Sequence, residues 1–439
     1  MTRKYSLLFL IIFLALFFRL YNLNHRYTFE WDQEDDALKV VSMINRRQPL
    51  LIGPRVANEN SFFVGPYHYY LLTPFYLLTH GDPVAGAYAA VFIGTLTSLV
   101  AYFVVKSLFN PQTGFVTACL FAVSPVIISW SAMYASLFSL IILFLCFRII
   151  SSSSVKFLSL LYFVLGLSIS THLASASLLI PALFVTFSSS PKPRAKQLLL
   201  FFLLFSIPFL PILLFDLRHD FLNSQKILAF VFNQNYGPKS PPLLFLRTFW
   251  RSLDFINFPG FSLISRTLSL LIIILGIRSF TQKRQRFLLA LWVMSPLLLL
   301  FFYHGNISEY YYASATTLIP IFFAKLINQF KNKLVLIPIL LFVFLIKLNI
   351  LIRDKPAVTL QTKKNLVSYL FNQKRDPYFN LSYDLPIGWN NGYSYLFRFY
   401  GKEPQNTPAA HLYTIALLSY PPNSGELVYR QSILGIFRR

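Results

Sequence analysis

The sequence predicts an all-α polytopic membrane protein of about eleven transmembrane helices, which ends in a small extracytoplasmic C-terminal α/β domain. Three observations support this prediction. Hydrophobic residues make up 55% of the 439 residues and charged residues 13%, about half the roughly 25% of a soluble protein. Apolar runs long enough to cross a bilayer recur along residues 1–352. Basic and acidic residues separate between alternate loops, which is typical of membrane topology.

The spanning segments are predicted from runs of about 20 mostly apolar residues. The first run, 5–22, follows Arg3 and Lys4 and has no small-residue cleavage site after it. We therefore expect a retained helix rather than a signal peptide. Ten further runs lie at 84–107, 113–130, 132–150, 156–170, 173–187, 197–215, 263–280, 287–303, 310–328 and 334–352.

The charges predict the orientation. With the N-terminus inside, every inner loop holds Lys or Arg and no acidic residue, and all sixteen Asp and Glu fall on the outer side. This pattern follows the positive-inside rule and explains much of the net charge of +23 without a nucleic-acid partner. The sequence therefore predicts a multi-pass protein of the plasma membrane with a cytoplasmic N-terminus and an extracytoplasmic C-terminus. The inner basic residues are Arg3, Lys4, Lys106, Arg148, Lys156, Lys192, Arg194, Lys196, Arg278, Lys283, Arg284, Arg286, Lys331 and Lys333.

Three long segments fall on the outer side, at 23–83, 216–262 and 353–439. The last of them loses the long apolar runs and gains turn signals such as Asp376-Pro377, and its alternating stretch His411–Leu418 suggests a strand. We therefore expect a transmembrane module over 1–352 and an extracytoplasmic domain over 353–439.

The first outer segment holds five acids within seven residues, Glu30-Trp31-Asp32-Gln33-Glu34-Asp35-Asp36. Apolar residues then recur at helical spacing, which predicts a short amphipathic helix on the membrane surface. With Asp32 at the N-cap and Asp35 at N3, these two carboxylates and that of Asp36 would gather at the first turn. The helix dipole favours one or two carboxylates there. So many at a lipid boundary indicate a cationic partner, a metal or catalysis.

The same segment continues with Gly65-Pro66-Tyr67-His68-Tyr69-Tyr70-Leu71. Its tyrosines suit a membrane interface, where the ring contacts lipid and the hydroxyl contacts water. His68 is a candidate ligand or proton carrier. Pro66 and Pro74 are predicted to bound a short interfacial or re-entrant helix.

Together these features resemble the GT-C superfamily of polytopic glycosyltransferases, and most closely the branch of protein O-mannosyltransferases and lipid A aminoarabinose transferases. The resemblance covers about residues 1–350, and the tail beyond them resembles no family. Many relatives have Asp-Glu where this chain has Asp32-Gln33. The matching features are the acidic motif after the first span, the surface helix, Gly65 to Leu71, short paired spans that meet at His172, Asp216 to His219, and Glu309 to Tyr311.

The resemblance implies a sugar donor on a polyprenyl phosphate and transfer on the outer face of the membrane, with Asp32 as general base. The acceptor hydroxyl needs a base because its pKa lies far above 7. One carboxylate opposite the leaving group gives inversion. Asp36 would orient this base, or bind Mg²⁺, Mn²⁺ or Ca²⁺ with it, although no cofactor is required. The acceptor stays open between a protein, a glycan and a glycolipid.

The leaving lipid phosphate needs cationic or hydrogen-bonding stabilisation, to which Arg is well suited. Arg218 is favoured because it adjoins His219, with a local ion pair to Asp216 or Asp220 as the structural alternative. The other outer arginines considered are Arg26, Arg55, Arg247 and Arg251. The predicted substrate-binding residues are Glu34, Tyr67, His68, Tyr69, His172, Arg218, His219 and Tyr310, followed by Tyr303, His304 and Tyr311.

Other functions stay open at this point. A secondary transporter predicts acids within its spans and paired halves, whereas the acids here lie at the outer edge and no internal repeat is evident. A ligase or polymerase with lipid-diphosphate donors predicts a catalytic Arg or His in place of a first-loop Asp. A non-catalytic assembly subunit is the third alternative. Solute uptake without a lipid donor would favour the transporter, and full activity of Asp32→Asn would favour the ligase.

Overall fold

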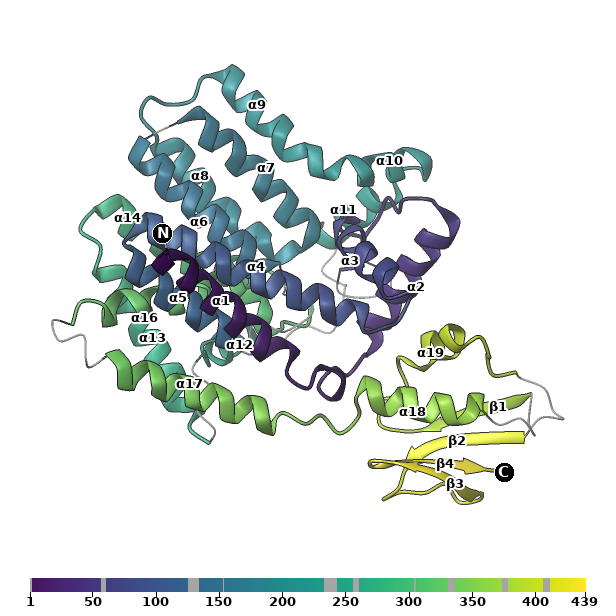
Figure 1. Cartoon of the computed structure of the whole chain (residues 1–439). Helices are drawn as coiled ribbons and strands as arrows, with labels where there is room; N and C mark the ends of the chain where they lie inside the picture. The colour runs from purple at the N-terminus through teal and green to yellow at the C-terminus, as the bar shows by residue number, and fades with distance from the viewer. Residues whose placement is uncertain are drawn as a thin grey trace. The chain divides into compact units, whose positions relative to one another are not determined.

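The predicted fold class is confirmed, because the chain is mostly helical and ends in a small sheet (Figure 1). It divides into two compact units. Unit 1 comprises Met1–Arg19, Leu50–His68 and Ala90–Leu351, and unit 2 comprises Leu20–Pro49, Tyr69–Ala89 and Ile352–Arg439. The computed structural model describes residues 2–56, 61–124, 134–152, 154–232, 243–255, 260–303, 305–330, 336–372, 378–405 and 411–439.

Each of the eleven predicted apolar runs coincides with one helix or with consecutive shorter ones. Residues 125–133 and 331–335, which hold parts of three of these runs as well as Lys331 and Lys333, lie outside the described residues. The matching helices are α1 (Thr2–Leu20), α4 (Ala85–Leu108), α5 (Pro111–Val123), α6 (Ala135–Ser152), α7 (Val155–Thr171), η4 (Leu173–Leu178), α8 (Leu179–Ser188), α9 (Ala195–Ser206), η5 (Ile207–Phe209), α10 (Leu210–Arg218), α13 (Ser262–Arg278), α14 (Lys283–Phe301), η6 (Glu309–Tyr312), α15 (Ala313–Thr316), α16 (Leu318–Ile327) and α17 (Leu336–Arg353).

By length and composition, four helical stretches among the described residues suffice to cross a membrane: Ala85–Leu108, Ala135–Ser152, Ala195–Arg218 and Lys283–Phe301. Four further apolar stretches are shorter, namely Tyr5–Leu20, Pro111–Val123, Val155–Thr171 and Leu173–Ser188. The number of eleven spans stays a prediction. Two more helices lie in the second outer segment, α11 (Leu222–Phe232) and α12 (Leu244–Ser252).

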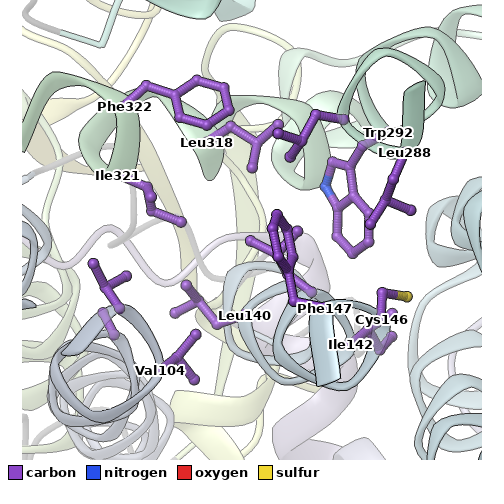
Figure 2. Close-up of a cluster of buried hydrophobic side chains, with 14 of the residues drawn as sticks. Val104, Leu140, Ile142, Cys146, Phe147, Leu288, Trp292, Leu318, Ile321 and Phe322 are labelled. Atoms are coloured by element: carbon purple, nitrogen blue, oxygen red, sulfur yellow. The ribbon is translucent and has the colours of Figure 1, made fainter. Parts of the chain in front are cut away.

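The core of unit 1 is formed by facing side chains of α4, α6, α14 and α16, which Figure 2 shows converging. Trp292 is fully buried there, and its indole Nε1 donates a hydrogen bond to Ser314 O at 2.9 Å. Cys146 also lies in this core, as expected of a packing residue. Because lipid is as apolar as leucine, close van der Waals packing holds such helices together more than the hydrophobic effect does.

A buried charge joins α1 to α5. The Arg19 guanidinium is 1% exposed and donates hydrogen bonds to Phe121 O and Ala122 O at the end of α5, and to Ala15 O. The last carbonyls of a helix lack internal partners and carry partial negative charge. Arg19 therefore satisfies the end of α5 within the helical core.

Unit 2 combines the surface helices with the tail. Its sheet has the order β1-β2-β4-β3, in which β1 and β2 are parallel and the other neighbours antiparallel. The parallel pair requires a crossover connection, and α19 lies in it. The elements of this unit are η1 (Leu23–His25), α2 (Trp31–Arg46), most of α3 (Tyr67–Leu78), α18 (Leu360–Phe371), β1 (Phe379–Asp384), α19 (Tyr393–Tyr400), β2 (His411–Leu417), β3 (Glu426–Gln431) and β4 (Leu434–Arg438).

Two local predictions can be compared directly. The predicted strand at His411–Leu418 is confirmed by β2. The helix predicted between Pro66 and Pro74 begins where expected but continues through Pro74 to Leu78. A proline inside a helix removes one hydrogen bond without necessarily ending the helix.

Candidate active site

The acidic motif forms the first turn of α2, with a different cap from the one predicted. Gln33 Oε1 accepts a hydrogen bond from Glu30 N at 2.8 Å, so that Glu30 is the N-cap and Gln33 the N3 residue. The predicted N-cap at Asp32 is therefore wrong by two residues, because the amide of Gln33 supplies the capping group. Asp32 and Asp36 still lie one turn apart, since four residues separate them.

In unit 2 the carboxylates of α2 lie close enough to Tyr69 of α3 for their charges to act on its hydroxyl. Burial, followed by the negative charges of Asp36, Asp35 and Asp32, raises the pKa of Tyr69, so its hydroxyl stays protonated at neutral pH. Asp35 forms an ion pair with Lys39, whose ammonium lies 5.7 Å from the Tyr69 ring centre. Asp32 is exposed and Asp36 half-buried. The structure thus brings together the predicted residues Asp32, Asp36 and Tyr69.

Glu34 has a different environment from these acids. Its side chain is buried, Oε2 accepts a hydrogen bond from Gly392 N at 2.7 Å, and Oε1 accepts one from Tyr395 N at 2.8 Å. Both carboxylate oxygens are thus engaged by the start of α19. The sequence predicts that Glu34 binds substrate, and the structure instead gives it a contact within the protein.

In unit 1 a second group forms around His172, between α7 and η4. The His172 ring lies 5.7 Å from the Tyr310 ring and 6.0 Å from the Tyr311 ring, measured between centres. His68 lies close enough for its charge to act on His172, and its Nδ1 is 2.9 Å from the hydroxyl of Tyr134. The structure thus groups three predicted substrate-binding residues, His68, His172 and Tyr310.

The His172 imidazole is neutral at pH 7. Burial, and then the charge of His68, lowers its pKa to about 4. Its Nδ1 is buried and has no hydrogen-bond partner among the described residues. A buried polar atom of this kind calls for a partner outside the described residues, such as a water molecule or a substrate. A neutral imidazole offers one donor and one acceptor, so it suits a hydroxyl group better than a phosphate anion.

Arg218 and His219 lie at the end of α10 and are exposed. Within the described chain, no ion pair joins Arg218 to Asp216 or Asp220. Asp216 is instead buried and accepts hydrogen bonds from Asn223 N, Ser224 N and the Ser224 hydroxyl. His219 stacks on Phe215 at 4.1 Å between ring centres, with its Nδ1 2.8 Å from Phe215 O.

The remaining predicted site residues differ in their burial and in their contacts. Tyr67 is half-buried at the first residue of α3, and burial raises its pKa. Arg26 pairs with Asp354 at 3.2 Å, whereas the guanidinium of Arg55 lies 4.9 Å from the Phe63 ring centre. Arg247 is exposed. Tyr303 packs against Tyr311, and His304 lies outside the described residues.

Sequence reasoning names Arg251 and Glu309 in unit 1 without pairing them, and it misses a second set of charges there altogether. Arg251 approaches Glu309 at 3.9 Å. Arg266 lies 3.7 Å from Asp254. Lys347 donates a hydrogen bond at 2.6 Å to the backbone oxygen of the next residue, Phe255, and is only 1% exposed. The signal for this second set is present in the sequence, because Lys347 is the only charged residue in the run 334–352, and charges within spans often have a function.

The described residues contain no group of three or more His, Cys, Asp or Glu side chains arranged to hold a metal. Asp32 and Asp36 provide two carboxylates one turn apart. Magnesium is often bound through one or two carboxylates together with substrate phosphates. The pair therefore fits a cation only if a substrate completes its ligands.

Part of the sequence matches a known family. Residues 64–215 match the model of the dolichyl-phosphate-mannose-protein mannosyltransferase family. This range includes the Gly65-Pro66 stretch, His68 and His172. No curated protein matches the chain in sequence.

Solved structures share the fold. ArnT from Cupriavidus metallidurans bound to undecaprenyl phosphate superposes with a TM-score of 0.66 at 11% identity, over 100% of this chain and 98% of that one. The apo state of the same protein gives 0.65 at 12% identity, with the same coverage. The oligosaccharyltransferase of Archaeoglobus fulgidus, in complex with zinc and sulfate, gives 0.50 at 12% identity over 84% of this chain and 56% of that one. At these identities the likeness concerns the fold.

Proposed function

We propose that the chain is a GT-C glycosyltransferase of the branch that includes ArnT and the protein mannosyltransferases, and that it transfers a sugar from a polyprenyl-phosphate donor to an acceptor hydroxyl with inversion. The observation that carries the proposal is the exposed Asp32 at the start of α2, grouped with Asp36 and Tyr69. The full-length fold match to ArnT, whose crystal structure holds undecaprenyl phosphate, supports the class of donor.

Asp32 acts as the general base. As the acceptor oxygen attacks the anomeric carbon, the hydroxyl proton passes to the Asp32 carboxylate, and the bond between the anomeric carbon and the phosphate oxygen breaks. The dipole at the start of α2 stabilises the carboxylate form of Asp32 before the reaction. Asp36, one turn further on, orients the acceptor or the base. The donated sugar inverts because a single displacement occurs.

The leaving lipid phosphate is already a good leaving group, so stabilisation of its charge replaces a general acid. Arg218, which is exposed at the end of α10, fits this role because guanidinium binds phosphate in a bidentate manner. The neutral His172, with Tyr310 beside it, fits hydrogen bonding to hydroxyl groups of the sugar or the acceptor. No step requires a metal.

The membrane supplies the setting of the reaction. We propose that the protein is an integral protein of the plasma membrane with α2 on the outer face, as the apolar helices and the distribution of charges predict. The acceptor is a protein, a glycan or a glycolipid on that face. Candidate acceptors can be compared directly once turnover of the donor is established.

The first experiment measures donor turnover. Purified protein in detergent is incubated with polyprenyl-phosphate sugars, and the release of free polyprenyl phosphate is followed. We expect Asp32→Asn to lower kcat about 10²–10⁴-fold. Asp35→Asn is the matched control, because it makes the same change in the same turn of α2 at a carboxylate that pairs with Lys39 and has no proposed catalytic role.

The outcomes separate the assignments. Release that both variants retain would keep the enzyme class but move the base to Asp36. Equal loss in both variants would point to a folding defect of α2 and contradict the assignment of Asp32. Absence of release by folded wild-type protein from every monophosphate donor, with turnover of a lipid-diphosphate sugar, would replace the proposal with the ligase.

A further inference from the structure

The residue before the acidic motif has an unusual backbone. Phe29 has φ 52°, in the left-handed region, although it is not glycine. Its side chain is fully buried, with ring centres 6.0 Å from Tyr27 and 5.9 Å from Tyr395. A bulky residue in this region costs about 1–2 kcal/mol. Such a conformation persists only where surrounding contacts hold it.

A buried lysine of the tail supplies one of these contacts. Lys363, on α18, is 2% exposed, and its ammonium donates to Phe29 O at 2.9 Å and to Asn391 O at 2.7 Å. Two carbonyl acceptors compensate part of the cost of burying the charge. The ammonium thus joins the segment that leads into α2 to the loop that leads into α19.

Glu34, five residues after Phe29, provides a second link between the acidic motif and the tail. Its carboxylate accepts from Gly392 N and Tyr395 N, the first backbone donors of α19, for which Gly392 is the N-cap. A carboxylate at this position satisfies donors that have no partner within the helix. Phe29 and Glu34 lie on either side of Asp32, so the tail holds the chain on both sides of the proposed base.

Gly392 allows this close approach. Its φ is +90°, and a Cβ atom at this position would lie 2.4 Å from Phe29 O and 3.2 Å from Lys363 Nζ. No side chain fits at the first of these distances. The α2 contact therefore requires glycine at 392 for two reasons, its backbone conformation and the space it leaves.

We propose that the C-terminal tail positions the acidic motif for catalysis, with Glu34, Lys363 and Gly392 as positioning residues that fix the start of α2. The inference rests on the proposed function, because it assigns a purpose to the geometry of Asp32 and Asp36. Misplacement of a catalytic group by about 1 Å can cost 10²-fold in rate. The tail is then part of the catalytic apparatus, and not an independent appended domain.

The test compares two glycines with nearly the same φ. Gly388 has φ +89°, and a Cβ atom added to it would have no atom within 4 Å, whereas Gly392 has φ +90° and the close contact with Phe29. Alanine at either position meets an unfavourable positive φ, and only Gly392→Ala pushes α2 away. We expect Gly392→Ala to lower kcat at least about tenfold with little change in KM, and Gly388→Ala to keep wild-type kcat.

Hydrogen exchange at residues 29–36 provides a readout that does not depend on activity. We expect exchange to be faster in Gly392→Ala and unchanged in Gly388→Ala. Faster exchange with wild-type kcat would overturn the positioning role. Unchanged exchange would overturn the contact itself. If wild-type protein turns over no donor, the proposed function fails, and the exchange result still decides whether the tail holds α2.

Neighbouring lysines give a second matched pair, which serves if Gly392→Ala fails to fold. Lys363 contacts Phe29, whereas Lys364 on the same helix pairs with Asp82 at 2.6 Å. Lys363→Met should lower kcat and speed exchange at residues 29–36. Lys364→Met should leave both unchanged. Equal kcat in the two folded variants would contradict the inference.

Discussion

The pKa of His172 couples a candidate substrate-binding residue to the stability of unit 1. The folded protein holds this pKa at about 4, below the ordinary 6.5, through burial and the nearby His68. Between pH 6.5 and 4 the unfolded chain therefore binds one more proton than the folded chain, and stability falls as the pH falls. We expect His172 to account for up to about 3 kcal/mol of this loss. The contribution of His172 is measured by comparing the apparent Tm at pH 7.5 and pH 5 in wild type and in His172→Gln.

The expected result is a smaller acid-induced drop in Tm for His172→Gln than for wild type. Glutamine keeps a donor and an acceptor but does not titrate. His219→Gln is the matched control, since His219 is an exposed histidine of the same unit, and it should follow the wild-type curve. Identical slopes for wild type and His172→Gln would show that His172 titrates normally in the folded protein.

At the scale of elements, Asp216 fixes the turn between α10 and α11. Its buried carboxylate accepts three hydrogen bonds from the start of α11. Asn223 in turn pairs with both backbone groups of Phe63, at 2.7 and 3.2 Å. We expect Asp216→Asn to destabilise the protein by about 2 kcal/mol, because the amide NH₂ group that replaces one carboxylate oxygen cannot accept from the donor it faces. A thermal melt in detergent tests this, with the exposed Asp220→Asn expected to melt like wild type.

The helices show which features of the fold can be predicted from the sequence. Helix positions follow from apolar runs, because a run of the required length leaves few alternatives in lipid. The predicted start of α2 lies two residues late, since Gln33 caps the helix and the neighbouring acids look equally capable in the sequence. The partners of Glu34 lie 358 and 361 residues further along the chain. No local sequence pattern predicts a contact between residues so far apart in the chain. Sequence analysis therefore groups Glu34 with the acids beside it.

The candidate site is predictable to a similar extent. Asp32 and Asp36 stand out in the sequence because so many carboxylates at a membrane boundary are unusual, Tyr69 belongs to a tyrosine-rich stretch that suits such a boundary, and the structure groups the three residues. Lys363 does not stand out, because it is one of several lysines in a polar tail and the adjacent Lys364 looks the same in the sequence. Its importance depends on burial and on two carbonyl acceptors, which only the folded chain reveals.

At the scale of the whole molecule, the separation of charge predicts which face each segment occupies. All sixteen acids fall in segments assigned to the outer side, together with α2 and the tail, while the assigned inner loops carry only Lys and Arg. The proposed reaction on the outer face requires this orientation, because in that proposal Asp32 meets the acceptor there. The opposite orientation would place the acidic motif in the cytoplasm and break the positive-inside rule at every loop.

Labelling of single cysteines tests this orientation. With Cys119 and Cys146 replaced by alanine, one cysteine is introduced at Tyr420, a 76% exposed residue of the tail, or at Lys192, an exposed residue of a predicted inner loop. A membrane-impermeant maleimide should label Tyr420→Cys in right-side-out vesicles, and Lys192→Cys only after the vesicles are opened. The reverse pattern would place α2 on the cytoplasmic side, where the proposed reaction would have to use a donor presented to the cytoplasm. Labelling of both before opening would mean leaky vesicles, which an enclosed cytoplasmic marker protein detects in the same sample.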